Sequence, residues 1–286
     1  MNRDHDEKQP LGARIAQFLQ RKRFVFFIPF IIIALLIFYV VWTLVSEKIF
    51  QESTILAEQI HEKYSGLEMI YDEQEQKAAE EEVQSLMGEA LQKYPGSYAA
   101  GKALIARASI YYKKVEESTA PDQTQVWFDI VSDFLEVVRF APESYLADLS
   151  LYQAAVVLEN LDLQVEKQGL KEITVEQMLE VIPDEFIQYF NFEIKRFTDI
   201  ATALYLYFAE QYKDSPRLPH VLLSAARLYQ AKSEELTSWG NSDKAEEAIN
   251  LAMEIYYQLE IDFPYSNWTN IARISIIELK IKNIIK

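Results

Sequence analysis

The sequence of 286 residues contains no cysteine and has only seven glycines, nine prolines and three histidines. Without cysteine the chain forms no disulfide, no thiolate zinc site, no iron–sulfur cluster and no thiol nucleophile. The scarcity of glycine argues against β-rich folds with many tight turns and against glycine-rich phosphate-binding loops. Half of the residues are apolar, which excludes disorder and leaves material for a large core. The composition therefore favours an all-α protein and indicates no particular reaction.

Charge is distributed unevenly along the chain. Residues 1–23 carry six basic against three acidic groups, residues 24–46 carry none, and residues 47–286 carry 22 basic against 41 acidic groups. Phosphate backbones repel an acidic body, so we expect no nucleic acid among the partners. These three segments are the expected domains: a basic tail (1–23), a membrane helix (24–46) and a body (47–286).

Residues 24–46 form an uncharged run, FVFFIPFIIIALLIFYVVWTLVS. A helix of this length reaches roughly 34 Å, enough for a hydrocarbon core of about 30 Å. Pro29 lies near its start, where a missing N–H costs little, and Tyr39 and Trp42 lie toward its far end, as membrane interfaces favour. The run is too long for a signal peptide, and no small-residue cleavage site follows it. We therefore expect a retained single-pass anchor in the lipid bilayer.

The flanking basic residues predict the orientation of this anchor. Arg14, Arg21, Lys22 and Arg23 precede the run, whereas Lys48 stands alone just after it. The positive-inside rule then places residues 1–23 in the cytoplasm and residues 47–286 across the membrane. In a bacterium this membrane is the inner one and the body is periplasmic; in a eukaryote the same topology gives a lumenal domain.

Beyond the anchor, apolar residues recur at three- and four-residue spacing, and no stretch alternates like a strand. Breakers with Pro, Gly or Asp separate the periodic segments, and Asp122, Ser144, Asp184 and Ser266 are the expected N-caps. Short connections favour antiparallel helix pairs. The predicted helices cover residues 47–70 (whether or not continuous with the anchor), 72–94, 97–117, 123–140, 144–168, 184–212, 217–237, 242–262 and 267–285.

Four of the connections repeat a pattern. Each ends one helix near an aromatic residue, breaks with Pro or Lys-Asp, and begins the next helix at a serine. The serine-to-serine spacings are 47, 71 and 51 residues. The four junctions are Tyr94-Pro-Gly-Ser97, Phe140-Ala-Pro-Glu-Ser144, Tyr212-Lys-Asp-Ser215 and Phe263-Pro-Tyr-Ser266.

This pattern resembles the tetratricopeptide repeat (TPR), in the variant with a Tyr-Pro-x-Ser turn that is common in bacterial envelope proteins. The resemblance covers residues 50–285 and implies an antiparallel helix-pair α-solenoid of about four degenerate repeats plus a capping helix. The sequence departs from the family pattern in its longer repeats, in Arg107 where the family prefers Leu, and in a segment, 160–183, that looks inserted.

The resemblance also implies a recurring pattern of residue types. Each second helix should carry small, aromatic and small residues at three positions, which here are Val83, Met87 and Ala90, then Ile130, Phe134 and Val137, then Ala201, Tyr205 and Phe208, then Ala252, Tyr256 and Leu259. The last helix should cap the stack with Trp268, Ile271, Ala272, Ser275 and Leu279.

A concave face formed by the first helices is the implied partner-binding surface. Aromatic residues and arginine are frequent anchors at interfaces. The alternative is that the segment 160–183 fills this face. The implied partner-binding residues are Lys102, Ser109 and Tyr112, then Tyr152, then His220, Arg227 and Gln230, with Ile105, Val156, Glu159 and Leu223 at the other concave positions.

Two other motifs have ordinary structural explanations. The segment 96–103 nearly matches a phosphate-binding loop, but Ala103 replaces the Ser or Thr that would hold magnesium, and a helix rather than a strand is predicted before it. Glu58 and His61 have the spacing of metal ligands on a helix, yet His220 is the only other histidine outside the tail. We therefore expect no catalytic residue, no metal and no cofactor.

These features together predict a non-catalytic protein–protein interaction scaffold on the extracytoplasmic side of the membrane. Anchor plus repeats resembles accessory subunits of the bacterial secretion translocon, which implies translocon subunits or periplasmic chaperones as partners. The alternative is a structural subunit of an envelope or motility machine, as in outer-membrane assembly, cell-wall synthesis or the flagellar apparatus. A third possibility, an enzyme, requires a pocket that pairs two of the 41 acidic groups of the body.

Overall fold

The computed structural model describes residues 11–117, 124–168 and 173–285. All regular structure in these ranges is helical, and they contain no strand, as the sequence predicts. The chain divides into two compact units, residues 1–55 and 56–286.

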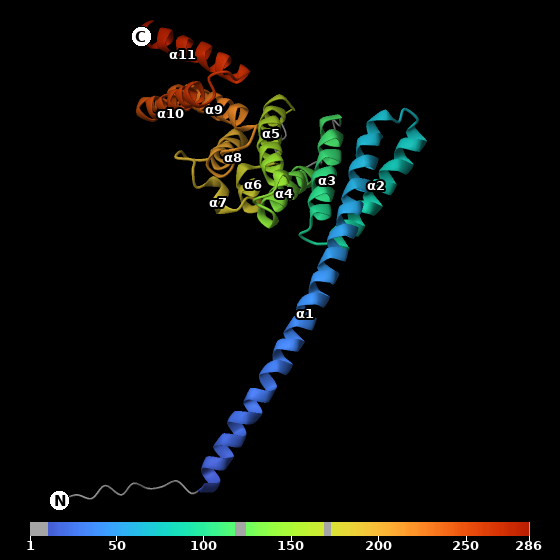
Figure 1. Cartoon of the computed structure of the whole chain (residues 1–286). Coiled ribbons are helices and arrows are strands. Elements are labelled where there is room, and N and C mark those ends of the chain that lie inside the picture. The colour runs from blue at the N-terminus through green and yellow to red at the C-terminus, as the bar shows by residue number, and fades with distance from the viewer. Residues whose placement is uncertain (1–10, 118–123, 169–172, 286) are drawn as a thin grey trace, which may run out of the picture. The chain divides into compact units, whose positions relative to one another are not determined.

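The first unit is the N-terminal part of α1 (Leu11–Gly66), a helix that continues into the second unit (Figure 1). From Pro29 onward this helix is long and apolar enough to cross a membrane, and none of its most apolar stretch is buried. Within that stretch the Thr43 hydroxyl donates to the Tyr39 carbonyl (2.8 Å), which satisfies it inside an apolar helix. The helix passes residue 47 without a break, so the predicted anchor and the first predicted body helix are continuous.

The second unit contains the end of α1 and all later helices. Their bounds are η1 (Leu67–Met69), α2 (Glu73–Lys93), α3 (Tyr98–Glu117), α4 (Thr124–Phe140), α5 (Tyr145–Gln168), α6 (Val175–Val181), α7 (Asp184–Ile187), α8 (Phe197–Gln211), α9 (Leu218–Ser238), α10 (Ser242–Asp262) and α11 (Asn267–Ile285). Each long helix from α2 onward packs on the next long helix along the chain, as Figure 1 shows from cyan to red. In addition, α3 contacts α5, and α9 contacts α11.

The predicted helix boundaries are confirmed to within a few residues, except for the segment 184–212. There the prediction of one helix is wrong, because α7 and α8 are separated by residues 188–196. Phe190 and Phe192 are buried in this connection, and both rings lie 5.9 Å from the Tyr229 ring. The Asp199 carboxylate accepts the two backbone N–H groups just before α8, at 2.8 and 3.0 Å. Tertiary burial and a capping carboxylate therefore override the helical pattern of the sequence.

The expected N-caps have different outcomes. Ser144 and Ser266 are confirmed, because the hydroxyl of each accepts a backbone N–H, of Ala147 (3.2 Å) and of Trp268 (3.3 Å). The prediction for Asp184 is wrong, because this residue is the first of α7 and Pro183 occupies the cap position. Asp122 lies outside the described residues.

The four repeated junctions share one hydrogen-bonding pattern. The residue three positions before the serine donates its N–H to the carbonyl four residues earlier, and its own carbonyl accepts the serine N–H. The serine N–H to carbonyl distances are 3.1 Å at Tyr94 and 3.0 Å at Ala141, Tyr212 and Phe263. Each serine hydroxyl in turn accepts a backbone N–H two or three residues later. The second junction therefore aligns on Ala141 and not on the aromatic Phe140.

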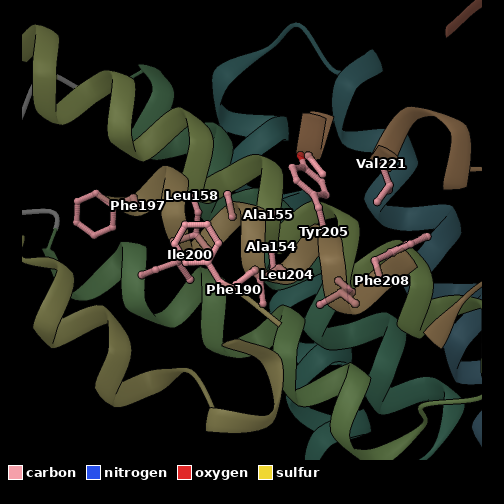
Figure 2. Close-up of a cluster of buried hydrophobic side chains, with 14 of the residues drawn as sticks. Ala154, Ala155, Leu158, Phe190, Phe197, Ile200, Leu204, Tyr205, Phe208 and Val221 are labelled. Atoms are coloured by element: carbon pink, nitrogen blue, oxygen red, sulfur yellow. The ribbon is translucent and has the colours of Figure 1, made fainter. Parts of the chain in front are cut away.

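The core follows the predicted spacing of the second helices. All of the residues that the resemblance placed there, on α2, α4, α8 and α10, are buried. Figure 2 shows part of the largest cluster, in which Ala154, Ala155 and Leu158 of α5 lie among Ile200, Leu204, Tyr205 and Phe208 of α8. On α11, Ala272 and Leu279 are buried with Ile276, whereas Trp268 and Ile271 are 38% and 42% exposed.

The segment 160–183 is not one insertion. α5 continues through Gln168 with Leu161 fully buried, and α6 packs against α4 with Met178 buried in the core. Residues 169–172 lie outside the described residues. The second half of this segment therefore contributes to the core beside α4.

Arg107, which departs from the repeat pattern, forms an ion pair with Asp133 in the structure. The Arg107 guanidinium on α3 donates to both carboxylate oxygens of Asp133 on α4, at 2.7 and 2.6 Å. Burial raises the pKa of Asp133, and the hydrogen bonds and charge of Arg107 oppose that rise. A bidentate ion pair therefore joins α3 to α4 at this position.

A buried polar network holds the start of α8. The Lys232 ammonium on α9 lies 2.9 Å from the Asp199 carboxylate and 3.0 Å from that of Glu235, and the Lys232 side chain is only 5% exposed. On the other side, the Asp162 carboxylate of α5 accepts the Phe197 N–H at 3.1 Å. These bonds fasten the irregular connection before α8 to the helices on either side of it.

The two glycines inside α2 and α3 give a matched test of this packing. A Cβ at Gly88 of α2 would meet no atom within 4 Å, whereas one at Gly101 of α3 would lie 3.0 Å from Leu146 Cδ1 and 3.4 Å from Phe140 Cζ. Gly88→Ala should raise the free energy of unfolding by about 0.5–1 kcal/mol, because alanine loses less backbone entropy on folding. Gly101→Ala should raise the free energy of unfolding by less than Gly88→Ala does, or lower it, because its Cβ would crowd Leu146 and Phe140. Urea denaturation of the full chain in detergent, followed by circular dichroism, measures both, and equal gains would contradict the packing around Gly101.

Candidate functional site

The seven partner-binding residues implied by the resemblance lie on three helices: Lys102, Ser109 and Tyr112 on α3, Tyr152 on α5, and His220, Arg227 and Gln230 on α9. They stand 5, 8, 12 or 15 residues after a junction serine. Residues three or four apart share one face of a helix, so each helix presents its members on one side. The structure brings the α5 and α9 members together and leaves the α3 members in a separate group.

An aromatic row crosses α5, α9 and α11. The His220 ring lies 5.5 Å from the Tyr152 ring on one side and 4.3 Å from the Trp268 ring on the other. Tyr152 also lies 6.4 Å from the buried Tyr205 ring of α8. Ring pairs at these distances add stabilisation beyond area burial, so the row is an ordered feature of the fold.

Two ionisable groups at this row, Glu159 and His220, have shifted pKa values. Burial raises the pKa of Glu159, and a hydrogen bond from the Tyr205 hydroxyl and the charge of Arg227 oppose that rise. Burial lowers the pKa of His220, and the Arg227 charge lowers it further. Arg227 is exposed and forms no ion pair within the described part of the chain. An exposed guanidinium without an ion-pair partner in the described residues therefore lies near the His220 imidazole of the row.

The other implied residues are engaged within the fold. The Tyr256 hydroxyl donates to the Gln230 amide oxygen at 3.3 Å. The Ser109 hydroxyl donates to its own helix, at the Ile105 carbonyl (2.8 Å). Of the other concave positions, Leu223 is 2% exposed and cannot contact a partner, so that projection is wrong.

Tyr112 and Lys102 also have intramolecular partners. The Tyr112 hydroxyl donates to Glu116 (2.8 Å) and accepts from the Asn160 amide (2.7 Å), while its ring meets Trp127 edge-on. The Lys102 ammonium lies 5.7 Å from the Tyr98 ring and 5.8 Å from the Tyr145 ring. These contacts tie α3 to α4 and α5.

Sequence reasoning missed Trp268, Tyr98 and Tyr145 as members of this surface. All three come one or two residues after a junction serine, at Ser97, Ser144 or Ser266. An aromatic residue in the first turn after that serine was therefore an available signal. The sequence alone does not show which residue of the adjacent helix each ring contacts.

The surface is not an enclosed cleft. Open hollows lie between the junctions at 142–148 and 211–215, where Tyr145 is among the lining residues, and between α8 and α10. Within the described residues no group of three or more His, Asp or Glu is arranged to hold a metal ion. The segment 96–103 follows α2, a helix, and Gly101 packs against α4 and α5, which accounts for that near-match as a repeat junction.

Comparison with protein-family models, with curated proteins and with solved structures finds no match to this chain.

The pKa of His220 tests the arrangement of the α9 residues. Its folded-state pKa lies below the usual 6.5, so this group costs the fold stability as pH falls from 6.5 through the lowered value. Arg227→Gln should raise the His220 pKa without restoring 6.5, because burial is the larger cause. An NMR titration of the imidazole measures the change. Arg139→Gln, at an exposed arginine of α4, should leave it unchanged, and an unaltered value in Arg227→Gln would contradict the proximity of the two groups.

Proposed function

We propose that this chain is a membrane-anchored, non-catalytic interaction scaffold, in which a TPR-like α-solenoid presents the exposed side of its first helices to partner proteins. The observation that carries the proposal is the set of four junctions with one hydrogen-bonding pattern. Equivalent junctions give equivalent helix pairs, and stacked pairs are an architecture that binds other proteins along the first-helix side. The aromatic row on α5, α9 and α11 supplies the interface anchors.

The anchor explains why such a scaffold would be effective. A module held at the membrane meets membrane complexes at a raised effective concentration, so modest affinity for each partner suffices. We propose that the basic tail is cytoplasmic and that the body lies outside the cytoplasm, in a bacterium in the periplasm. Accessory handling of chains that emerge from the secretion translocon is the role that we favour.

Photo-crosslinking in living cells tests this function. A benzophenone amino acid in place of Arg227, on the proposed face, should crosslink specific proteins, whereas the same group in place of Arg139 on α4 should not. Both arginines are exposed, so the two positions are matched in chemistry and access.

The identity of the captured proteins separates the alternatives. Translocon subunits and periplasmic chaperones would support a secretion accessory, and one fixed envelope or motility complex would instead indicate a structural subunit. Cytosolic proteins would contradict the topology. No crosslinks from position 227, or equal crosslinks from position 139, would contradict the assignment of the Arg227 side of α9 as the partner-binding surface.

A further inference from the structure

We propose that the surface formed by His220 and Arg227 of α9 with Trp268, Ile271 and Ile274 of α11 (the α9–α11 face) binds a protein segment that carries apolar side chains and at least one carboxylate. This inference rests on the proposed function and specifies the chemistry of the partner. Two independent features carry it, an unpartnered apolar stripe and an unpaired arginine.

The apolar stripe lies on α11. Trp268, Ile271 and Ile274 are spaced by three residues and are 38%, 42% and 58% exposed. Ile277 and Ile281 are also exposed, at 57% and 50%, while Ala272, Ile276 and Leu279 are buried in the core. No described helix of the second unit has more large exposed apolar side chains. Contiguous apolar surface of this kind marks a site of association.

The unpaired arginine lies on α9. Arg107, Arg196, Arg217 and Arg273 each form an ion pair with a carboxylate, whereas Arg227 and Arg139 form none within the described residues. Of these two, Arg227 is the one whose charge acts on His220. The carboxylate of Glu159, the acid that Arg227 influences, accepts the hydroxyl of the buried Tyr205 instead. An exposed guanidinium without a protein acceptor is suited to a bidentate carboxylate from a partner.

The two features are joined through His220. Its ring lies 4.3 Å from Trp268, and it precedes Arg227 by seven residues, about two turns along the same side of α9. A segment whose apolar side chains cover Trp268 and Ile271 can therefore place a carboxylate at Arg227. Charge also discriminates: the whole chain is at −16, so its general field repels acidic segments and only a local cation can select one.

Three fluorescein-labelled amphipathic helical peptides test this proposal. They share one leucine face and carry only Glu, only Gln or only Lys at the polar positions. Fluorescence anisotropy would measure their binding to the full chain in phosphocholine nanodiscs at physiological salt. The Glu peptide should bind about tenfold more tightly than the Gln peptide, the size expected for a hydrogen bond between charged groups.

The variants locate the effect. Arg227→Gln should abolish the preference for Glu over Gln, Arg227→Glu should reverse it in favour of Lys, and Arg139→Gln should change nothing. Trp268→Ala should weaken all three peptides alike. A preference that survives Arg227→Gln, or a Lys peptide that binds best to the unaltered chain, would overturn the proposal.

Two further outcomes separate this inference from the proposed function. Specific crosslinks from position 227 together with no dependence on peptide charge would leave the scaffold in place and overturn the chemistry of the partner. Failure of all three peptides, with Trp268-dependent binding to phosphatidylglycerol vesicles instead, would overturn the inference and assign the face to a lipid surface.

Discussion

The arrangement of the second unit depends on the turn that ends at Ser97, Ser144, Ser215 and Ser266. In each turn the carbonyl three residues before the serine accepts the serine N–H, and the serine hydroxyl accepts a backbone N–H two or three residues later. The C-cap residues Tyr94, Tyr212 and Phe263 have nearly the same backbone angles, with φ between −130° and −118° and ψ between 51° and 54°. The same turn therefore precedes α3, α5, α9 and α11. The helix begins one residue after the serine at α3, α5 and α11, and three residues after it at α9.

The connection between α5 and α8 is much longer than the four turns. Buried charged groups, not a short turn, fix its end at α8: Lys232 bonds to Asp199, and Asp162 bonds to the backbone of Phe197 and to Arg196. Breaking a buried pair by removing one partner typically costs about 3–5 kcal/mol, so these bonds specify the geometry strongly. The position of α8, and with it that of the Tyr205 ring beneath Tyr152 and Glu159, depends on them.

Most helices could be predicted because their signals are local: a periodic apolar stripe, a proline or glycine breaker, and a serine cap. The segment 184–212 could not, since its helix is interrupted by burial of Phe190 and Phe192 against Tyr229, a residue far along the chain. The same reason applies to Arg107, whose role appears only with Asp133 across the helix pair. For the site, the resemblance put Tyr152 and His220 on one expected surface, and their rings lie 5.5 Å apart. Trp268 could not be added from the sequence because its contact with His220 depends on how α11 packs on α9. Leu223 is excluded because it is buried.

The proposed scaffold requires residues 47–286 to lie outside the cytoplasm. The chain contains no cysteine, so single introduced cysteines can report the side of the membrane directly. Single cysteines can be introduced in a bacterium by Glu246→Cys, at an exposed site of α10, and by Gln17→Cys, before the apolar segment. A membrane-impermeant maleimide applied to spheroplasts should label the cysteine at position 246 at once and that at position 17 only after the membrane is opened. Labelling in the opposite order would contradict the extracytoplasmic scaffold.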